Sequence, residues 1–191
     1  MNWRLPILSI LLRMNGSGIP AKLAEMRRCE KLPRHELLRR QADDLRRLLL
    51  HSAVHVPYYR EALRASGVVR DGTVHLERFT DIPVLTKDMI RARFDDLTSD
   101  DIDKRSWYFN TSGGSTGEPV RFIQDSQLEA WQVANKIYYK TFGGQQMGDR
   151  ELRLWGSERD IMAGNETLAK RLTYWLYNRR EFNTFRMTRD H

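Results

Sequence analysis

The sequence has little cysteine and no long hydrophobic run. Its one cysteine, Cys29, rules out an intrachain disulfide framework and a cysteine-rich zinc site. No stretch reaches the roughly 18–20 apolar residues that a membrane-spanning helix needs, which excludes a polytopic membrane protein. Internal repeats and low-complexity tracts are also missing. Because a single thiol suits a reducing compartment, we expect a cytoplasmic protein.

The remaining composition is that of a folded, basic protein. Hydrophobic residues make up 40% of the 191 positions, enough to form a core, and 32 Lys and Arg against 25 Asp and Glu give a net charge of +7. Such charge attracts nucleic acid, anionic lipid or phosphorylated ligands. In the basic stretch 27–47, however, leucines recur on the opposite side of a helical pattern, which favours a solvated helix face. No known nucleic-acid motif accompanies the charge, so we expect no specific nucleic-acid partner.

The first 20 residues form a separate N-terminal helix or loop segment in our interpretation. The apolar run 6–12 is too short to span a bilayer. A helix here would pack on the protein's own core or lie on a membrane surface with weak contact. We expect the first arrangement, and the second stays open.

The hydrophobic pattern predicts helices first and then alternating strands and helices, an α/β layer fold. An acidic surface loop is expected over 95–103. A capping-box spacing of Ser126 and Glu129 predicts the start of one helix. Val56-Pro57 should interrupt the first long helix, and Thr86 should cap the helix that follows the extended segment 82–85. The predicted helices cover 35–52, 58–65, 86–94, 126–142 and 168–176, and the predicted strands cover 107–109, 120–123, 152–155 and 182–187.

A loop rich in glycine and hydroxyl residues joins the predicted strands 107–109 and 120–123. It reads Thr-Ser-Gly-Gly-Ser-Thr-Gly-Glu-Pro over 111–119. Glycines let a ligand approach the main chain, and consecutive amides and hydroxyls converge on an anion such as phosphate. It is not a Walker loop, because Glu118 stands at the position of the second glycine and no lysine follows in the loop. A hairpin connection without a ligand is the alternative.

The string Ser-Gly-Gly-Ser-Thr-Gly-Glu-Pro resembles the phosphate-binding signature of the adenylate-forming superfamily. The family often has lysine where this chain has Val120, which removes one positive charge beside the phosphates. The flanking strings His-Val-Pro-Tyr-Tyr-Arg-Glu (55–61), Ile-Pro-Val-Leu-Thr-Lys (82–87), Gly-Asp-Arg (148–150) and Leu-Trp-Gly (154–156) resemble the phenylacetate-CoA ligase, CapK-like and coenzyme F390 synthetase-like branch. CapK-like members are connected with capsular polysaccharides.

The resemblance implies a fold, a reaction and a site. The fold would be the N-terminal part of the large domain of the adenylate-forming synthetases, with residues 21–191 as a partial adenylation domain. Such ligases join a carboxylic acid to ATP with Mg²⁺, release pyrophosphate, and pass the acyl-adenylate to a thiol such as CoA. The residues that would wrap the β- and γ-phosphates are Ser112, Gly113, Gly114, Ser115, Thr116 and Gly117. No catalytic residue is assigned.

Family members are more than twice as long as this chain. We therefore expect an N-terminal fragment that is inactive alone and associates with a missing C-terminal half. A non-catalytic remnant that binds phosphate or nucleotide, and a basic module for nucleic acid or membrane surfaces, are the alternatives.

The histidines show one spacing that suits a metal. His51 and His55 are four residues apart, which makes a metal pair possible, but two ligands are too few for a stable site. We therefore assign no metal site from the sequence.

Overall fold

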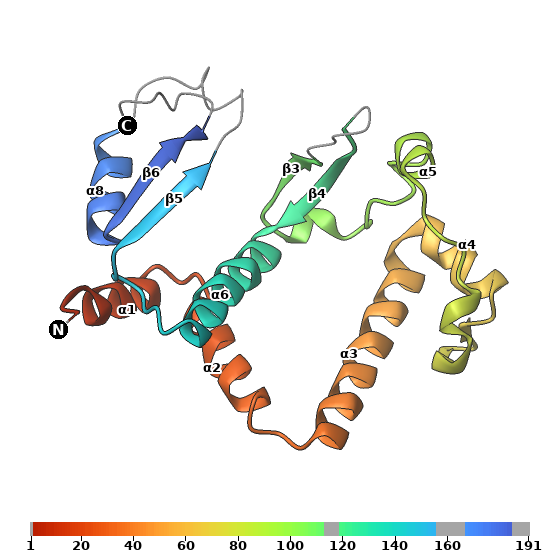
Figure 1. Cartoon of the computed structure of the whole chain (residues 1–191). Coiled ribbons are helices and arrows are strands. Elements are labelled where there is room, and N and C mark those ends of the chain that lie inside the picture. The colour runs from red at the N-terminus through yellow and green to blue at the C-terminus, as the bar shows by residue number, and fades with distance from the viewer. Residues whose placement is uncertain (1, 113–118, 156–166, 185–191) are drawn as a thin grey trace. The chain divides into compact units, whose positions relative to one another are not determined.

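The computed structural model describes residues 2–112, 119–155 and 167–184 (Figure 1). The chain divides into two compact units, Met1–Met26 with Ala130–His191, and Arg27–Glu129. Helices and small two-stranded sheets occur in both units, which confirms the α/β class. Among the described residues, no helix has the length and hydrophobicity that crossing a membrane requires.

Two helices form the first part of the unit Arg27–Glu129. These are α3, Arg34–His55, and α4, Pro57–Ala65. Val56 between them is extended, because a residue before proline is kept out of the helical region, so the predicted break is confirmed. The core between them centres on the buried side chains Leu49, Leu63 and Val68.

Short elements continue this unit. Strands β1, Val69–Arg70, and β2, Thr73–Val74, form an antiparallel pair and are followed by the 3₁₀ helix η1, Leu76–Asp81. Helix α5, Lys87–Ala92, begins after Thr86, whose hydroxyl accepts a hydrogen bond from the amide of Met89 over 3.2 Å. The predicted N-cap is therefore confirmed.

The acidic stretch 95–103 consists mostly of turns, and hydrogen bonds attach it to the helices. It contains the 3₁₀ helix η2, Ile102–Lys104. The amide of Tyr58 donates to the carbonyl of Asp96 over 3.0 Å, and the amide of Asp100 donates to the carbonyl of His55 over 2.8 Å. These hydrogen bonds hold the stretch against the junction of α3 and α4.

The predicted strands around the glycine-rich loop form an antiparallel hairpin that leads into a helix (Figure 1). They are β3, Trp107–Thr111, and β4, Arg121–Asp125, and α6 is Ser126–Phe142. The capping-box spacing predicted Ser126 as the N-cap of α6, and this prediction was wrong by one residue. Ser126 already lies in the helix, and Asp125 Oδ1 accepts the hydrogen bond from the amide of Leu128 over 2.8 Å. A carboxylate at this position also suits the positive end of the helix dipole.

The other unit contains the N-terminal helices α1, Arg4–Met14, and α2, Ile19–Cys29. Its core cluster consists of Leu12, Ile19, Leu23, Ala130 and Ala134, so these helices pack against α6. Leu8 and Leu12 are buried, as expected for a helix that packs on the protein's own core.

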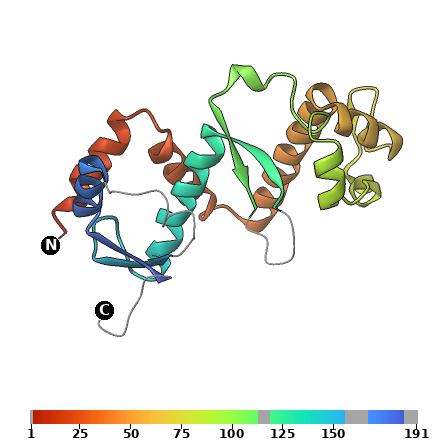
Figure 2. The same ribbon diagram turned by 90° about the horizontal axis from the view of Figure 1, so that it is seen from above.

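A parallel strand pair completes this unit. Strands β5, Glu151–Trp155, and β6, Arg179–Asn183, are in register from Glu151 opposite Arg179 to Trp155 opposite Asn183. Helix α8, Leu168–Leu176, lies between them in sequence, as the crossover of parallel strands requires. Figure 2 shows α8 beside α1, where the rings of Trp3 and Trp175 are 5.9 Å apart. Strand β6 begins three residues before the predicted start.

Candidate functional site

The β3–β4 hairpin holds both ends of the glycine-rich loop. At its loop end, the amide of Ser112 donates to the carbonyl of Val120 over 2.9 Å, and the amide of Val120 donates to Ser112 Oγ over 3.0 Å. At the other end, the amide of Ser126 donates to the carbonyl of Ser106 over 2.9 Å. The hairpin stem is thus closed at both ends by backbone hydrogen bonds.

Of the six predicted phosphate-binding residues, only Ser112 lies among the described residues. Its amide hydrogen is directed at the carbonyl of Val120, so its hydroxyl is the group left to donate to an anion. The remaining five residues, Gly113, Gly114, Ser115, Thr116 and Gly117, lie outside the described part of the chain.

Side chains on the stem also bond across the strands. Gln124 is buried, and its Oε1 accepts hydrogen bonds from Tyr108 Oη over 3.2 Å and from Asn110 Nδ2 over 2.7 Å. A buried amide with satisfied partners specifies one pairing register. The loop is therefore attached to a well-specified stem.

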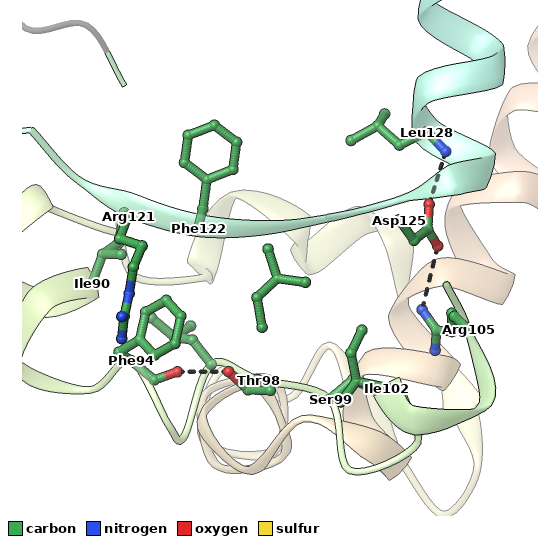
Figure 3. Close-up of a pocket in the computed structure, with 12 residues that line it drawn as sticks. Ile90, Phe94, Thr98, Ser99, Ile102, Arg105, Arg121, Phe122, Asp125 and Leu128 are labelled. Atoms are coloured by element: carbon green, nitrogen blue, oxygen red, sulfur yellow. Dashed lines mark hydrogen bonds and ion pairs between the residues drawn. The ribbon is translucent and has the colours of Figure 1, made fainter. Parts of the chain in front are cut away.

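A cleft of about 360 Å³ runs along β4, on the side facing α5 and the turns after it (Figure 3). Arg121 and Asp125 lie at opposite ends of the strand segment in this view, with Phe94, Thr98 and Ile102 below it. The middle of the cleft is largely apolar and its two ends carry charge. Its lining consists of Ile90, Phe94, Leu97, Thr98, Ser99, Ile102, Arg105, Arg121, Phe122, Ile123, Asp125 and Leu128.

The end of the cleft nearest the loop carries a guanidinium group. Arg121 pairs with Thr111 in the hairpin register, directly beside the loop. Its guanidinium carbon is 4.6 Å from the ring centroid of Phe94 and 4.5 Å from that of Phe109. Each such cation–π contact contributes about 0.5–1 kcal/mol at an exposed position. The guanidinium therefore lies over these two rings, and its residue occupies the strand position at the loop end of the hairpin.

The opposite end is organised around Arg105. Its guanidinium forms an ion pair with Asp101, is 3.1 Å from His51 Nε2, and is 3.9 Å from Asp125 Oδ2. The hydrogen bond from Arg105, together with a second one from Ser99 Oγ over 2.5 Å, lowers the pKa of Asp101 well below its ordinary range. Asp101 is therefore a carboxylate at neutral pH.

Sequence reasoning found the loop but missed the cleft. Side chains alternate between the two faces of a strand, so the sequence alone predicts that Arg121, Ile123 and Asp125 lie on one face of β4. Phe94 and Arg105, however, come from outside β4, and no local pattern connects them with it.

The basic stretch on α3 is partly neutralised within the helix. Arg46 forms an ion pair with Asp43 over 3.1 Å, and Arg47 pairs with Asp44 one position further along. Each pair spans three residues, a spacing that brings side chains together on a helix surface. These ion pairs reduce the positive charge that the helix presents.

Neither the protein-family models nor the curated proteins compared with this chain gave a match. The resemblance to adenylate-forming enzymes therefore rests on the motifs quoted above.

Proposed function

We propose that residues 112–117 bind the phosphates of ATP. The chain then supplies the phosphate-binding part of an adenylate-forming ligase of the phenylacetate-CoA ligase and CapK-like branch. The carboxylate of an acid attacks the α-phosphorus, pyrophosphate leaves, and the acyl-adenylate passes to a thiol such as CoA. In this proposal the α/β units belong to the N-terminal part of the large domain of that fold.

The observation that carries the proposal is the attachment of the Ser-Gly-Gly-Ser-Thr-Gly segment to a closed hairpin. The paired residues Ser112 and Val120 hold its two ends together. The segment offers three hydroxyls and three glycine amides within six residues, and phosphate oxygens need several donors at once. Such positioning and charge stabilisation are most of what a protein contributes to nucleotidyl transfer.

Arg121 gives further support. The position where the family often has lysine is Val120 here, and the next residue provides a cation at the same end of the hairpin. As part of this proposal, the guanidinium of Arg121 compensates part of the negative charge of a triphosphate. Mg²⁺ bound with the nucleotide would neutralise more of it.

The proposal can be tested by titrating the isotope-labelled chain with MgATP or with pyrophosphate. The amide chemical shifts, monitored by NMR, report the binding. We expect a Kd of about 1 mM or weaker, near −4 kcal/mol, because the segment provides only part of a nucleotide pocket. Thr116→Ala should weaken binding by removing a hydroxyl donor, whereas Thr80→Ala, at an exposed position in η1, should not. Equal affinities of the wild type and Thr116→Ala would contradict the proposal.

A further inference from the structure

We propose that His51, His55 and Asp101 form a binding site for a divalent cation of the zinc class. One ligand atom from each residue lies within 4.8 Å of the other two. The imidazole rings are 4.6 Å apart between centroids. This site does not depend on the proposed nucleotide-binding function.

Two elements bring the ligands together. His51 and His55 occupy adjacent turns near the C-terminal end of α3, so both rings lie on one face of the helix. Asp101 comes from the acidic stretch, whose backbone is tied to the same turn by the hydrogen bond from the amide of Asp100 to the carbonyl of His55. This long-range contact supplies the third ligand that the sequence alone did not reveal.

The hydrogen bond to His55 is one that metal-binding histidines commonly make. Its Nδ1 is 2.7 Å from Asp100 Oδ1. A carboxylate there holds the proton on Nδ1 and leaves the lone pair of Nε2 for a metal. Asp100 therefore orients His55 and increases its basicity as a ligand.

The guanidinium of Arg105 contacts two of the three proposed ligands, as a bound metal ion would. It donates toward His51 Nε2 over 3.1 Å and pairs with Asp101. His51 Nε2 thus presents a lone pair, as a metal ligand must. A bound cation would displace the guanidinium, and Asp125 Oδ2, 3.9 Å from Arg105 Nη1, offers it another carboxylate.

The donor set selects the class of metal. Two imidazoles and one carboxylate suit Zn²⁺, Co²⁺ and Ni²⁺, whereas Mg²⁺ and Ca²⁺ prefer oxygen ligands alone. Zinc–ligand bonds of about 2.0–2.2 Å require the donors to move closer than the present 3.9 Å between His51 Nε2 and Asp101 Oδ1. Both rings are partly exposed, with 37% of the His51 side chain and 30% of the His55 side chain accessible, so small rotations are open to them and a water can complete the site.

The site can be tested by titrating the untagged full chain with Co²⁺ and monitoring its visible absorption. Zn²⁺ is then added as a competitor. We expect one Co²⁺ per chain, displaced by Zn²⁺. His51→Ala and Asp101→Asn should each weaken binding at least tenfold, and Asp100→Asn should weaken it about tenfold. Arg105→Gln should bind more tightly, because the competing cation is removed. Circular dichroism establishes that each variant is folded.

The matched control is His75→Ala. His75 is also paired with a carboxylate, since its Nδ1 is 3.1 Å from Glu77 Oε1, but it belongs to no such cluster among the described residues. Its loss should leave Co²⁺ affinity unchanged. The proposal is overturned if the wild type does not bind Co²⁺, if folded His51→Ala binds as tightly as the wild type, or if His75→Ala weakens binding equally.

Discussion

Ser112 Oγ accepts a hydrogen bond from the amide of Val120 over 3.0 Å, and the amide of Ser112 donates to the carbonyl of Val120 over 2.9 Å. One residue thus provides both a donor and an acceptor to the opposite side of the hairpin. Val120 is buried, so its amide has little access to water as an alternative partner. The side chain of Ser112 therefore belongs to the stem of the hairpin as well as to the proposed phosphate-binding segment.

Replacing Ser112 should loosen the loop end of the hairpin. Ser112→Ala leaves the amide of Val120 without its acceptor, which costs about 1–3 kcal/mol for a buried group. We expect faster hydrogen exchange at the amide of Val120 and a lower urea midpoint. Ser112→Thr keeps the hydroxyl and should retain most of the protection. An unchanged exchange rate at Val120 in Ser112→Ala would show that the hydroxyl does not hold the hairpin.

Local signals in the sequence predicted the elements around the site. The leucine spacing gave α3, the residue before Pro57 gave the break, and Thr86 gave the cap of α5. These features depend on the geometry of neighbouring residues, so a short window of sequence determines them. The hairpin around the glycine-rich loop belongs to the same group.

Features that depend on distant residues were not predictable in this way. The capping-box spacing favoured Ser126, yet Asp125 caps α6, because the pairing of Trp107 with Asp125 extends β4 up to the helix. Similarly, the meeting of Asp101 with His51 depends on how the acidic stretch folds back on α3. No spacing within one element encodes such contacts.

Gly148 lies against the N-terminal segment with no room for a side chain. A Cβ at this position would be 2.6 Å from the Cβ of Arg4 and 2.9 Å from Asn2 Oδ1, and the backbone φ of +86° also favours glycine. Asn2 Nδ2 donates to the carbonyl of Met147 over 2.8 Å, so the segment cannot move away without losing this bond. We expect Gly148→Ala to lower the free energy of unfolding, measured with urea. The steric contacts of the new Cβ should account for about 1–3 kcal/mol, in addition to the cost of backbone strain.

Gly144→Ala is the control that isolates the steric part. Gly144 has a similar φ of +76°, but nothing lies within 4 Å of a Cβ built there. Its substitution should cost only the strain of a left-handed residue, about 1–2 kcal/mol. Equal losses in the two variants would mean that the contact with Arg4 relaxes freely.

Ion pairs of Glu151 on β5 link this strand to β6 and to α6. Its carboxylate is 2.5 Å from Lys140 Nζ and 3.1 Å from Arg179 Nη2. Burial raises the pKa of Glu151, but the hydrogen bonds and charges of Lys140 and Arg179 outweigh burial and lower the pKa below its ordinary value of 4.5. Because the folded protein holds the charged form more strongly than the unfolded chain does, ionised Glu151 stabilises the fold.

This stabilisation should be complete above about pH 5 and should disappear as the pH falls through the lowered pKa of the folded state. Glu151→Gln should therefore have a lower urea midpoint than the wild type at pH 7, and the two midpoints should converge below pH 4 as the wild-type carboxyl takes up a proton. Glu129→Gln, at an exposed position in the first turn of α6, should lose only the weak attraction of its charge to the helix dipole, about 0.3–1 kcal/mol, and should differ from the wild type less than Glu151→Gln does. A difference between Glu151→Gln and the wild type that stays constant from pH 7 to pH 3 would show that the shape of the side chain, and not its charge, stabilises the strand pair.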